Sequence, residues 1–286
     1  MLHVRWPSFE GKIKDWSKIK RASYWMAAEV LALYPHQHLV FLARDATIIY
    51  DIAKLLTRGS SHSNRIHLLS ISQGSVSKNE LQFYLNSKGI TDSLISENGL
   101  VLVDSGYRAS MLDRFRSLFP KHVKKIQGHM IHAKPKIYSG QRKAAMSFAA
   151  FEILNPGVLG HYNINDYSGV AAFENLPHTT ARTTDYENVN GVWKAKSLNV
   201  ADTGEVEMAH AWQQDIKWQF GSNSSQNNFL KIVSDIRLAL RNPLDSSLHP
   251  EVRARLPLLQ KTRQDLENLS QHGDADYKPP IHPDLR

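Results

Sequence analysis

The sequence of 286 residues contains no cysteine, which excludes disulfide bonds, thiolate zinc sites and cysteine nucleophiles. Long hydrophobic runs are also missing, because no window approaches the roughly 18 consecutive apolar residues that a membrane helix needs. The opening residues, MLHVRWPSFEGKIKDW, lack the apolar segment of a signal peptide. We therefore expect a cytoplasmic globular protein that does not enter a membrane.

Charge of one sign is in excess, with 35 Lys and Arg against 27 Asp and Glu and a net charge of +8. This balance favours an anionic partner, which could be a nucleic acid, a phosphorylated metabolite or a membrane surface. The basic residues are scattered apart from a denser stretch at 121–143, and they form no aromatic-interleaved basic motif of the kind that stacks on bases. We expect mainly solvated surface charge, with nucleic-acid binding as the alternative.

The segment 99–115, GLVLVDSGYRASMLDRF, joins a strand, a tight turn and a helix. Four apolar residues at 100–103 run into Asp104, and a helical pattern follows the small-residue loop at 105–110. A junction of this kind places a carboxylate at the carboxyl end of a strand. It also directs free backbone N–H groups at a ligand above it, as in α/β proteins that bind phosphates.

A second junction of the same kind lies upstream, in segment 38–56. Apolar residues at 39–43 run into Arg44 and Asp45, and an amphipathic helix follows. Two such junctions, each with an acidic residue at the turn, are the strongest indication of a functional site in this sequence.

Strand and helix patterns alternate between residues 38 and 132. The expected strands are 39–43, 65–71, 100–103 and 126–132, and the expected helices are 48–56, 78–88 and 109–119. This alternation predicts an α/β fold, a Rossmann-like parallel sheet with crossover helices. An amphipathic helix over 13–34, ended by Pro35, precedes the sheet.

The pattern of the sequence changes after residue 146. Asn190-Gly191 between two β-prone runs predicts a hairpin, and helical patterns follow at 205–220 and 229–240. We therefore expect three regions: an α/β core domain with its N-terminal helix at 1–146, a mixed, mainly helical lobe with loops and the hairpin at 147–270, and a flexible tail at 271–286.

The two junctions would bring their polar side chains to the carboxyl edge of the sheet. Asp45 and Asp104 are candidate catalytic carboxylates there, and Asp104 is also the candidate metal ligand. The candidate phosphate- and sugar-binding residues are Arg44, Ser105, Gly106, Tyr107, Arg108 and Ser110, which supply guanidinium groups, hydroxyls and a helix N-terminus. The alternative is that Arg44 and Asp45 form an internal ion pair and that Ser105-Gly106 is an ordinary turn.

A second candidate site is the polar loop at 173–186, FENLPHTTARTTDY. Its many hydrogen-bonding groups predict a surface position. His178 could serve as a general acid or base near neutral pH, and Arg182 could hold a negative charge on a substrate. The alternative is a solvated connection between the two lobes, with Pro177 and the threonines serving only as turn residues.

Three segments together, FLARDATIIYDIAKLL, LLSISQGSV and LVLVDSGYRAS, resemble the type I phosphoribosyltransferases over residues 38–133. The resemblance implies a phosphoribosyltransferase-like fold that binds phosphoribosyl pyrophosphate with magnesium. It also implies that Arg44 and Asp45 lie in the pyrophosphate loop, that Asp104 faces the ribose, and that 106–110 form the phosphate loop. The family usually has two adjacent acids where this chain has Asp104-Ser105.

These observations favour a nucleotide-binding transferase that moves a phosphoribosyl or glycosyl group, with a phosphorylated small molecule as substrate. The missing second acid supports an alternative, a non-catalytic module that binds nucleic acid or protein on a degenerate transferase fold. A phosphohydrolase related to the haloacid dehalogenases is a third reading. Its Asp-x-Asp motif is missing, because Asp45 is followed by Ala46-Thr47 and Asp104 by Ser105-Gly106.

Overall fold

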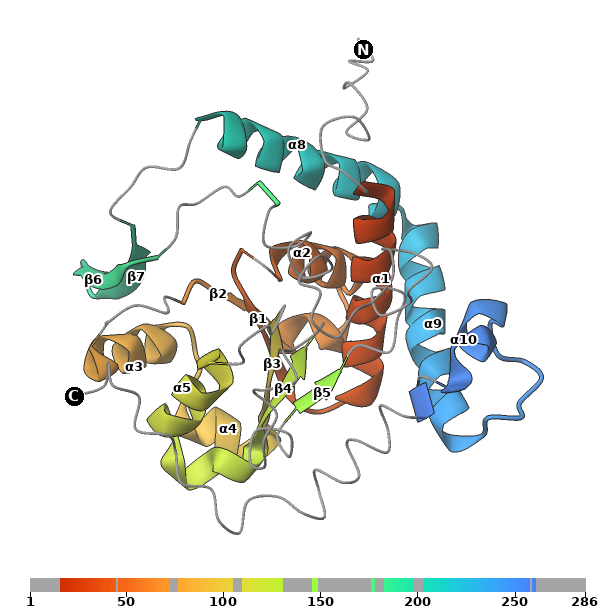
Figure 1. The fold of residues 1–286 in the computed structure, drawn as a ribbon, viewed down its shortest axis with the longest axis horizontal. Coiled ribbons are helices and arrows are strands. Elements are labelled where there is room, and N and C mark those ends of the chain that lie inside the picture. Colours follow the sequence, from red (N-terminus) through yellow and green to blue (C-terminus); the bar gives the residue numbers. More distant parts are fainter. Residues whose placement is uncertain are drawn as a thin grey trace, which may run out of the picture.

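A five-stranded parallel sheet lies at the centre of the protein (Figure 1). The computed structural model describes residues 16–44, 46–71, 77–104, 110–130, 146–148, 176–177, 183–197, 203–257 and 259–260. The strand order is β2-β1-β3-β4-β5, and every neighbouring pair is parallel. The strands are β1 (His38–Leu42), β2 (Ile66–Leu69), β3 (Leu100–Asp104), β4 (Ile126–Met130) and β5 (Met146–Phe148). The predicted α/β fold with a parallel sheet is confirmed.

Helices cover both faces of the sheet, so that the fold has three layers (Figure 1). One layer contains α1 (Trp16–Leu33), α2 (Thr47–Leu56), α8 (Thr203–Phe220) and α9 (Asn223–Arg241), with the short α10 (Pro250–Ala254) beside α9. The other layer contains α3 (Lys78–Ser87), α4 (Asp92–Asn98) and α5 (Ser110–Leu118). Two 3₁₀ turns, η2 (Ser61–Arg65) and η3 (Pro120–Lys125), precede β2 and β4.

The central strands are apolar on both faces, as expected for a parallel sheet that is covered on both sides. Leu39 and Phe41 of β1 pack with α1, α2 and α9, whereas Val40 and Leu42 pack with α3 and α5. The C-terminal helices contribute large buried side chains to the first of these clusters, including Trp212 of α8, Phe229 of α9 and their neighbours Ile216, Ile232 and Ile236. Helices α8 and α9, which lie within the predicted C-terminal lobe, therefore share one core with α1 and α2.

Polar contacts join α1 to α8 and α9 across long stretches of sequence. The Trp16 indole N–H and the Lys20 ammonium group both donate to Asp215, at 2.8 and 2.7 Å. Arg237 donates to the carbonyl oxygen of Leu31 at 2.8 Å. These contacts reinforce apolar packing that already fixes the position of α1.

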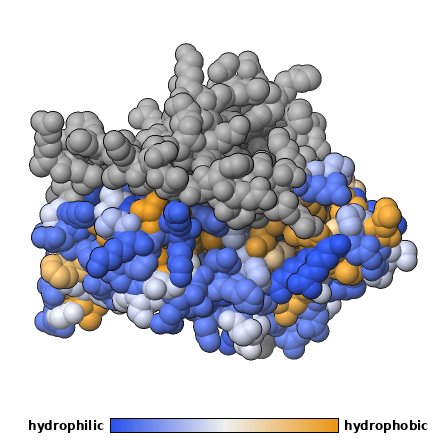
Figure 2. Space-filling model, turned by 90° about the horizontal axis from the view of Figure 1, so that it is seen from below, coloured by the Kyte–Doolittle hydropathy of each residue, from blue (hydrophilic) through white to orange (hydrophobic). Residues whose placement is uncertain are grey.

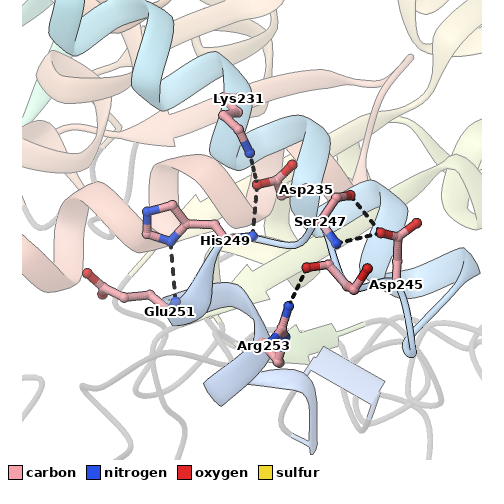
Figure 3. Close-up of polar contacts among 8 residues, drawn as sticks. Lys231, Asp235, Asp245, Ser247, His249, Glu251 and Arg253 are labelled. Atoms are coloured by element: carbon pink, nitrogen blue, oxygen red, sulfur yellow. Dashed lines mark hydrogen bonds and ion pairs between the residues drawn. The ribbon is translucent and has the colours of Figure 1, made fainter.

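The turn between α9 and α10 is organised by the buried carboxylate of Asp235 (Figure 3). This carboxylate accepts hydrogen bonds from the Lys231 ammonium group at 2.6 Å and from the His249 backbone N–H at 3.1 Å. The His249 ring in turn accepts from the backbone N–H of Glu251 at 3.3 Å, which caps α10. The capped turn sets where α10 packs on α9.

A two-stranded antiparallel hairpin, β6 (Asp185–Val189) and β7 (Val192–Lys196), projects beside α3 (Figure 1). Asn190 and Gly191 at its turn have φ of 54° and 83°, the left-handed conformation that this dipeptide favours. The hairpin predicted from Asn190-Gly191 is thus confirmed.

Two helical features differ from the sequence prediction. Helix α4 was not expected, because its seven residues are too few to show a period. Helix α9 begins at Asn223 rather than 229, because the Ser222 hydroxyl accepts from the Ser225 N–H at 3.1 Å and caps a polar first turn. The predicted tail at 271–286 lies outside the described residues.

The described part of the surface that one view shows is mainly polar. The described face in Figure 2 is mostly hydrophilic, with small separate hydrophobic patches. In the part of the chain that the structure describes, no helix combines the length and apolar character needed to span a membrane.

Candidate functional site

The order of the strands reverses at one point of the sheet. β1 lies between β2 and β3, so the connections leaving β1 and β2 lead to opposite sides of β1. In open sheets of this order, the carboxyl ends of the two strands at the reversal diverge and bind ligands. Here those strands are β1 and β3, the two strands that carry the acidic junctions predicted from the sequence.

Arg44 occupies the turn between β1 and α2 in a conformation that is rare for its residue type. Its φ is +78°, in the left-handed region that costs a non-glycine residue about 1–2 kcal/mol. The turn is held by the Arg44 N–H, which donates to the Thr47 hydroxyl at 2.9 Å, and by the Ala46 N–H, which donates to the Leu42 carbonyl at 3.1 Å. Backbone strain of this kind is concentrated at binding and catalytic sites.

The Arg44 side chain is half-buried, and its Nε atom is buried without a hydrogen-bond partner among the described residues. An unfilled N–H donor on a guanidinium group is costly to leave in the protein interior. An anionic oxygen satisfies such a donor and also matches its charge.

Asp104 is the last residue of β3 and is half-buried. Phe41 of β1 pairs with Val103, so the turn after β1 passes next to Asp104 at the same edge of the sheet. Asp104 itself lies opposite Met130 at the end of β4. The structure thus brings Arg44 and Asp104 to one edge, as the sequence predicts.

Magnesium was the predicted cofactor, with Asp104 as its ligand. Within the described ranges, no group of three or more His, Asp or Glu side chains is arranged to hold a metal ion. Magnesium commonly keeps several waters and uses one or two carboxylates together with substrate phosphates. A single half-buried carboxylate at this edge of the sheet fits this mode of binding.

Of the other predicted site residues, only Ser110 lies within the described part of the chain. Ser110 is the first residue of α5, so the expected helix N-terminus lies beside the end of β3. The candidates Asp45, Ser105, Gly106, Tyr107, Arg108, His178 and Arg182 lie outside the described residues.

A tyrosine pair at the carboxyl end of β2 was not predicted from the sequence. Tyr84 of α3 and Tyr186 of β6 stack with ring centroids 4.5 Å apart, and both hydroxyls contact the backbone of Ser70. Arg114 of α5 is close enough to Tyr186 to interact with it electrostatically, while burial lowers the pKa of Arg114. The sequence signal for this pair was the alternation of Tyr186 with polar residues in β6. It indicates that one face of the strand is buried, but not which residues that face contacts.

Comparison of the chain with known protein families, with curated proteins and with solved structures gives no match. The class of the protein therefore rests on its own fold and site: a three-layer α/β protein with a strained arginine turn and a carboxylate at the reversal of strand order.

Proposed function

We propose that this protein binds a phosphorylated sugar or a nucleotide at the carboxyl edge of its sheet and transfers a phosphoribosyl or glycosyl group. We further propose that its α/β fold is of the Rossmann-like, phosphoribosyltransferase-like kind. The main support is the position of Arg44 and Asp104 at the carboxyl ends of β1 and β3, where the strand order reverses. Open parallel sheets bind phosphorylated ligands at such a reversal.

The strained turn supports an anionic ligand. Glycine would relieve the strain at φ +78°, so an arginine in this conformation favours a role for its side chain. The buried Nε of Arg44 supplies a donor that a phosphate oxygen would fill. In this proposal Arg44 holds the outer phosphate, and the loop at 106–110 with the N-terminus of α5 holds the inner phosphate.

Asp104 orients the sugar by accepting hydrogen bonds from its hydroxyl groups. A magnesium ion held by Asp104 and the ligand's phosphate oxygens would neutralise the charge that develops on a pyrophosphate leaving group. Asp45 would act beside Arg44 as a second carboxylate. His178 would serve as general acid or base and Arg182 as a charge clamp, if their loop closes over the ligand.

The test is isothermal titration of the whole protein with phosphoribosyl pyrophosphate and with nucleoside di- and triphosphates, each with and without magnesium. We expect binding that Asp104→Asn weakens at least about tenfold without changing the unfolding midpoint. Asp245→Asn is the matched control, because Asp245 lies in the turn between α9 and α10, outside the sheet.

The outcomes separate the classes of function. Absence of binding across the panel, or full activity of Asp104→Asn, contradicts the proposal. Binding of DNA or RNA that weakens steeply with salt, without binding of small phosphates, identifies a nucleic-acid-binding module instead. Hydrolysis of a generic phosphate ester identifies a phosphohydrolase.

A further inference from the structure

A groove of about 340 Å³ lies between α2 and α8. It is built from the C-terminal half of α2, the η2 turn and the middle of α8. Because α2 runs back from the carboxyl edge, this groove lies toward the amino edge of the sheet, away from the turn at Arg44. The polar residues that line it include Asp51, Lys54, Arg58, Ser63, Gln213 and Lys217.

Positive charge dominates the groove. Lys54 is held in place by a hydrogen bond from its ammonium group to the Ser63 carbonyl at 2.7 Å. Arg58 and Lys217 are exposed, and within the described part of the chain neither forms an ion pair with a carboxylate. Three cations therefore face one carboxylate, that of Asp51.

Asp51 is held at the wall of the groove by Gln213, whose side-chain N–H donates to it at 3.1 Å. Burial raises the pKa of Asp51 to about 6, although Gln213 and Lys217 both act to lower it. Burial also raises the pKa of the neighbouring Tyr50, with a contribution from Asp51. A carboxylate that titrates close to neutral pH in a basic groove is typical of a binding or catalytic position.

A larger groove of about 600 Å³, between α1, α9 and α10, differs in how its charged side chains are paired. Its charged residues are already paired, Lys20 with Asp215 and Arg21 with Glu251. An anion entering that groove would have to displace an existing partner, whereas among the described residues neither Arg58 nor Lys217 of the groove between α2 and α8 forms an ion pair.

We propose that the groove between α2 and α8 binds a small phosphate monoester that carries hydroxyl groups, such as a sugar phosphate or a mononucleotide, at a site separate from the sheet edge. Arg58 and Lys217 bind the phosphate oxygens. Asp51 accepts a hydrogen bond from a ligand hydroxyl, and Leu55 and Ile216 form the apolar floor under the ring. The volume suits a ligand of this size.

The first experiment titrates the full chain with ribose 5-phosphate, adenosine monophosphate and inorganic sulfate. Arg58→Ala combined with Lys217→Ala should weaken binding of the esters at least about tenfold. Lys121→Ala combined with Lys124→Ala removes the same charge from exposed residues of η3 and should leave binding within about twofold of native. Unfolding midpoints of both double variants check that the fold is intact.

The second experiment uses inorganic sulfate, whose charge is constant between about pH 5.5 and 7.5. Protonation of Asp51 removes the only negative charge facing the groove among the described residues, so the sulfate affinity should rise several-fold as the pH falls through this range. The other charged groups that face the groove are Lys54 from α2, Arg58 from the turn after α2 and Lys217 from α8. His67, which interacts with Lys54, has its pKa lowered to about 4.

Asp51→Asn should bind sulfate more tightly than native protein at pH 7.5 and show no rise on acidification. The proposal is wrong if native protein binds none of the probes, or if the Arg58 and Lys217 double variant binds the esters as native does. It is also wrong if Asp104→Asn abolishes the same binding, because the ligand would then occupy the sheet edge. A failure here leaves the proposed transferase site untouched, since the two sites share no residue.

Discussion

The rings of Tyr84 and Tyr186 are stacked, with centroids 4.5 Å apart and 26° between their planes. Their hydroxyls meet the same backbone unit: the Ser70 N–H donates to the Tyr84 oxygen at 3.1 Å, and the Tyr186 hydroxyl donates to the Ser70 carbonyl at 3.3 Å. Ser70 directly follows β2, so this pair fastens the β6–β7 hairpin to the carboxyl edge of the sheet.

Tyr186→Ala should release the hairpin, because it removes a buried ring and the stacking of that ring on Tyr84. We expect a loss of about 3 kcal/mol in the free energy of unfolding. Tyr186→Phe keeps the ring and loses one hydrogen bond, so it should cost only about 1 kcal/mol. Urea denaturation measures both values, and limited proteolysis of the hairpin measures its release. Equal losses in the two variants would show that the ring contributes nothing.

Arg44→Gly and Arg44→Ala form a matched pair for the strained turn. Both variants lack the guanidinium group, but only alanine must keep a Cβ at φ +78°. Arg44→Gly should therefore be more stable than Arg44→Ala by about 1 kcal/mol. Both should weaken binding of phosphorylated ligands equally. Thermal unfolding and titration test the two statements, and equal stability of the variants would argue against strain at this turn.

Gly99 links α4 to β3 with φ of +74°, and a Cβ there would lie 3.1 Å from the Lys125 carbonyl oxygen. Gly89 has a similar φ of +79°, with open space around it. Gly89→Ala should cost about 1–2 kcal/mol from the backbone conformation alone. Gly99→Ala should cost about 1 kcal/mol more, because the backbone of Lys125 has to move. Urea midpoints that fall together would contradict this ranking.

His38 and His67 are adjacent on β1 and β2, with His38 Nδ1 2.8 Å from His67 Nε2. Burial, His38 and Lys54 lower the pKa of His67 to about 4 from 6.5, and burial and Arg65 lower the pKa of His38. The folded protein thus favours neutral rings, which stabilises it fully above pH 6.5. This stabilisation is lost as the pH falls from 6.5 toward 4, because the unfolded chain binds protons first.

His67→Gln should therefore reduce the loss of stability between about pH 7 and pH 5. Urea denaturation at several pH values in this range measures the slope for both proteins. His62 and His129, whose pKa values burial lowers to about 4 and about 3, leave a residual slope in the variant. An unchanged slope in His67→Gln would show that this histidine pair does not couple protonation to folding.

The sheet could be predicted from the sequence because its central strands are continuous apolar runs, such as 100–103, each followed by a turn. The juxtaposition of Arg44 and Asp104 followed from the same pattern, since the carboxyl ends of parallel strands share an edge. The order of the strands did not follow, because it depends on which strands pair. The backbone strain at Arg44 could not be predicted either, because residue types alone do not give its φ angle.

The groove between α2 and α8 could not be predicted for a different reason. The spacing of Asp51 and Lys54 on α2, and of Arg58 just after it, indicates an ordinary solvated helix face. What makes it a groove is the packing of Gln213 and Lys217 from α8, far along the chain. Contacts between distant segments are set by tertiary packing, which local periodicity does not encode.

The contacts between α1 and the C-terminal helices have a consequence for the folding of the chain during its synthesis. Trp16 meets Asp215, Leu31 meets Arg237, and Arg21 meets Glu251. On the ribosome, the apolar face of α1 emerges roughly ten seconds or more before the helices that cover it. Until its last third has been synthesised, the nascent chain exposes this apolar face, which is the kind of surface that chaperones bind.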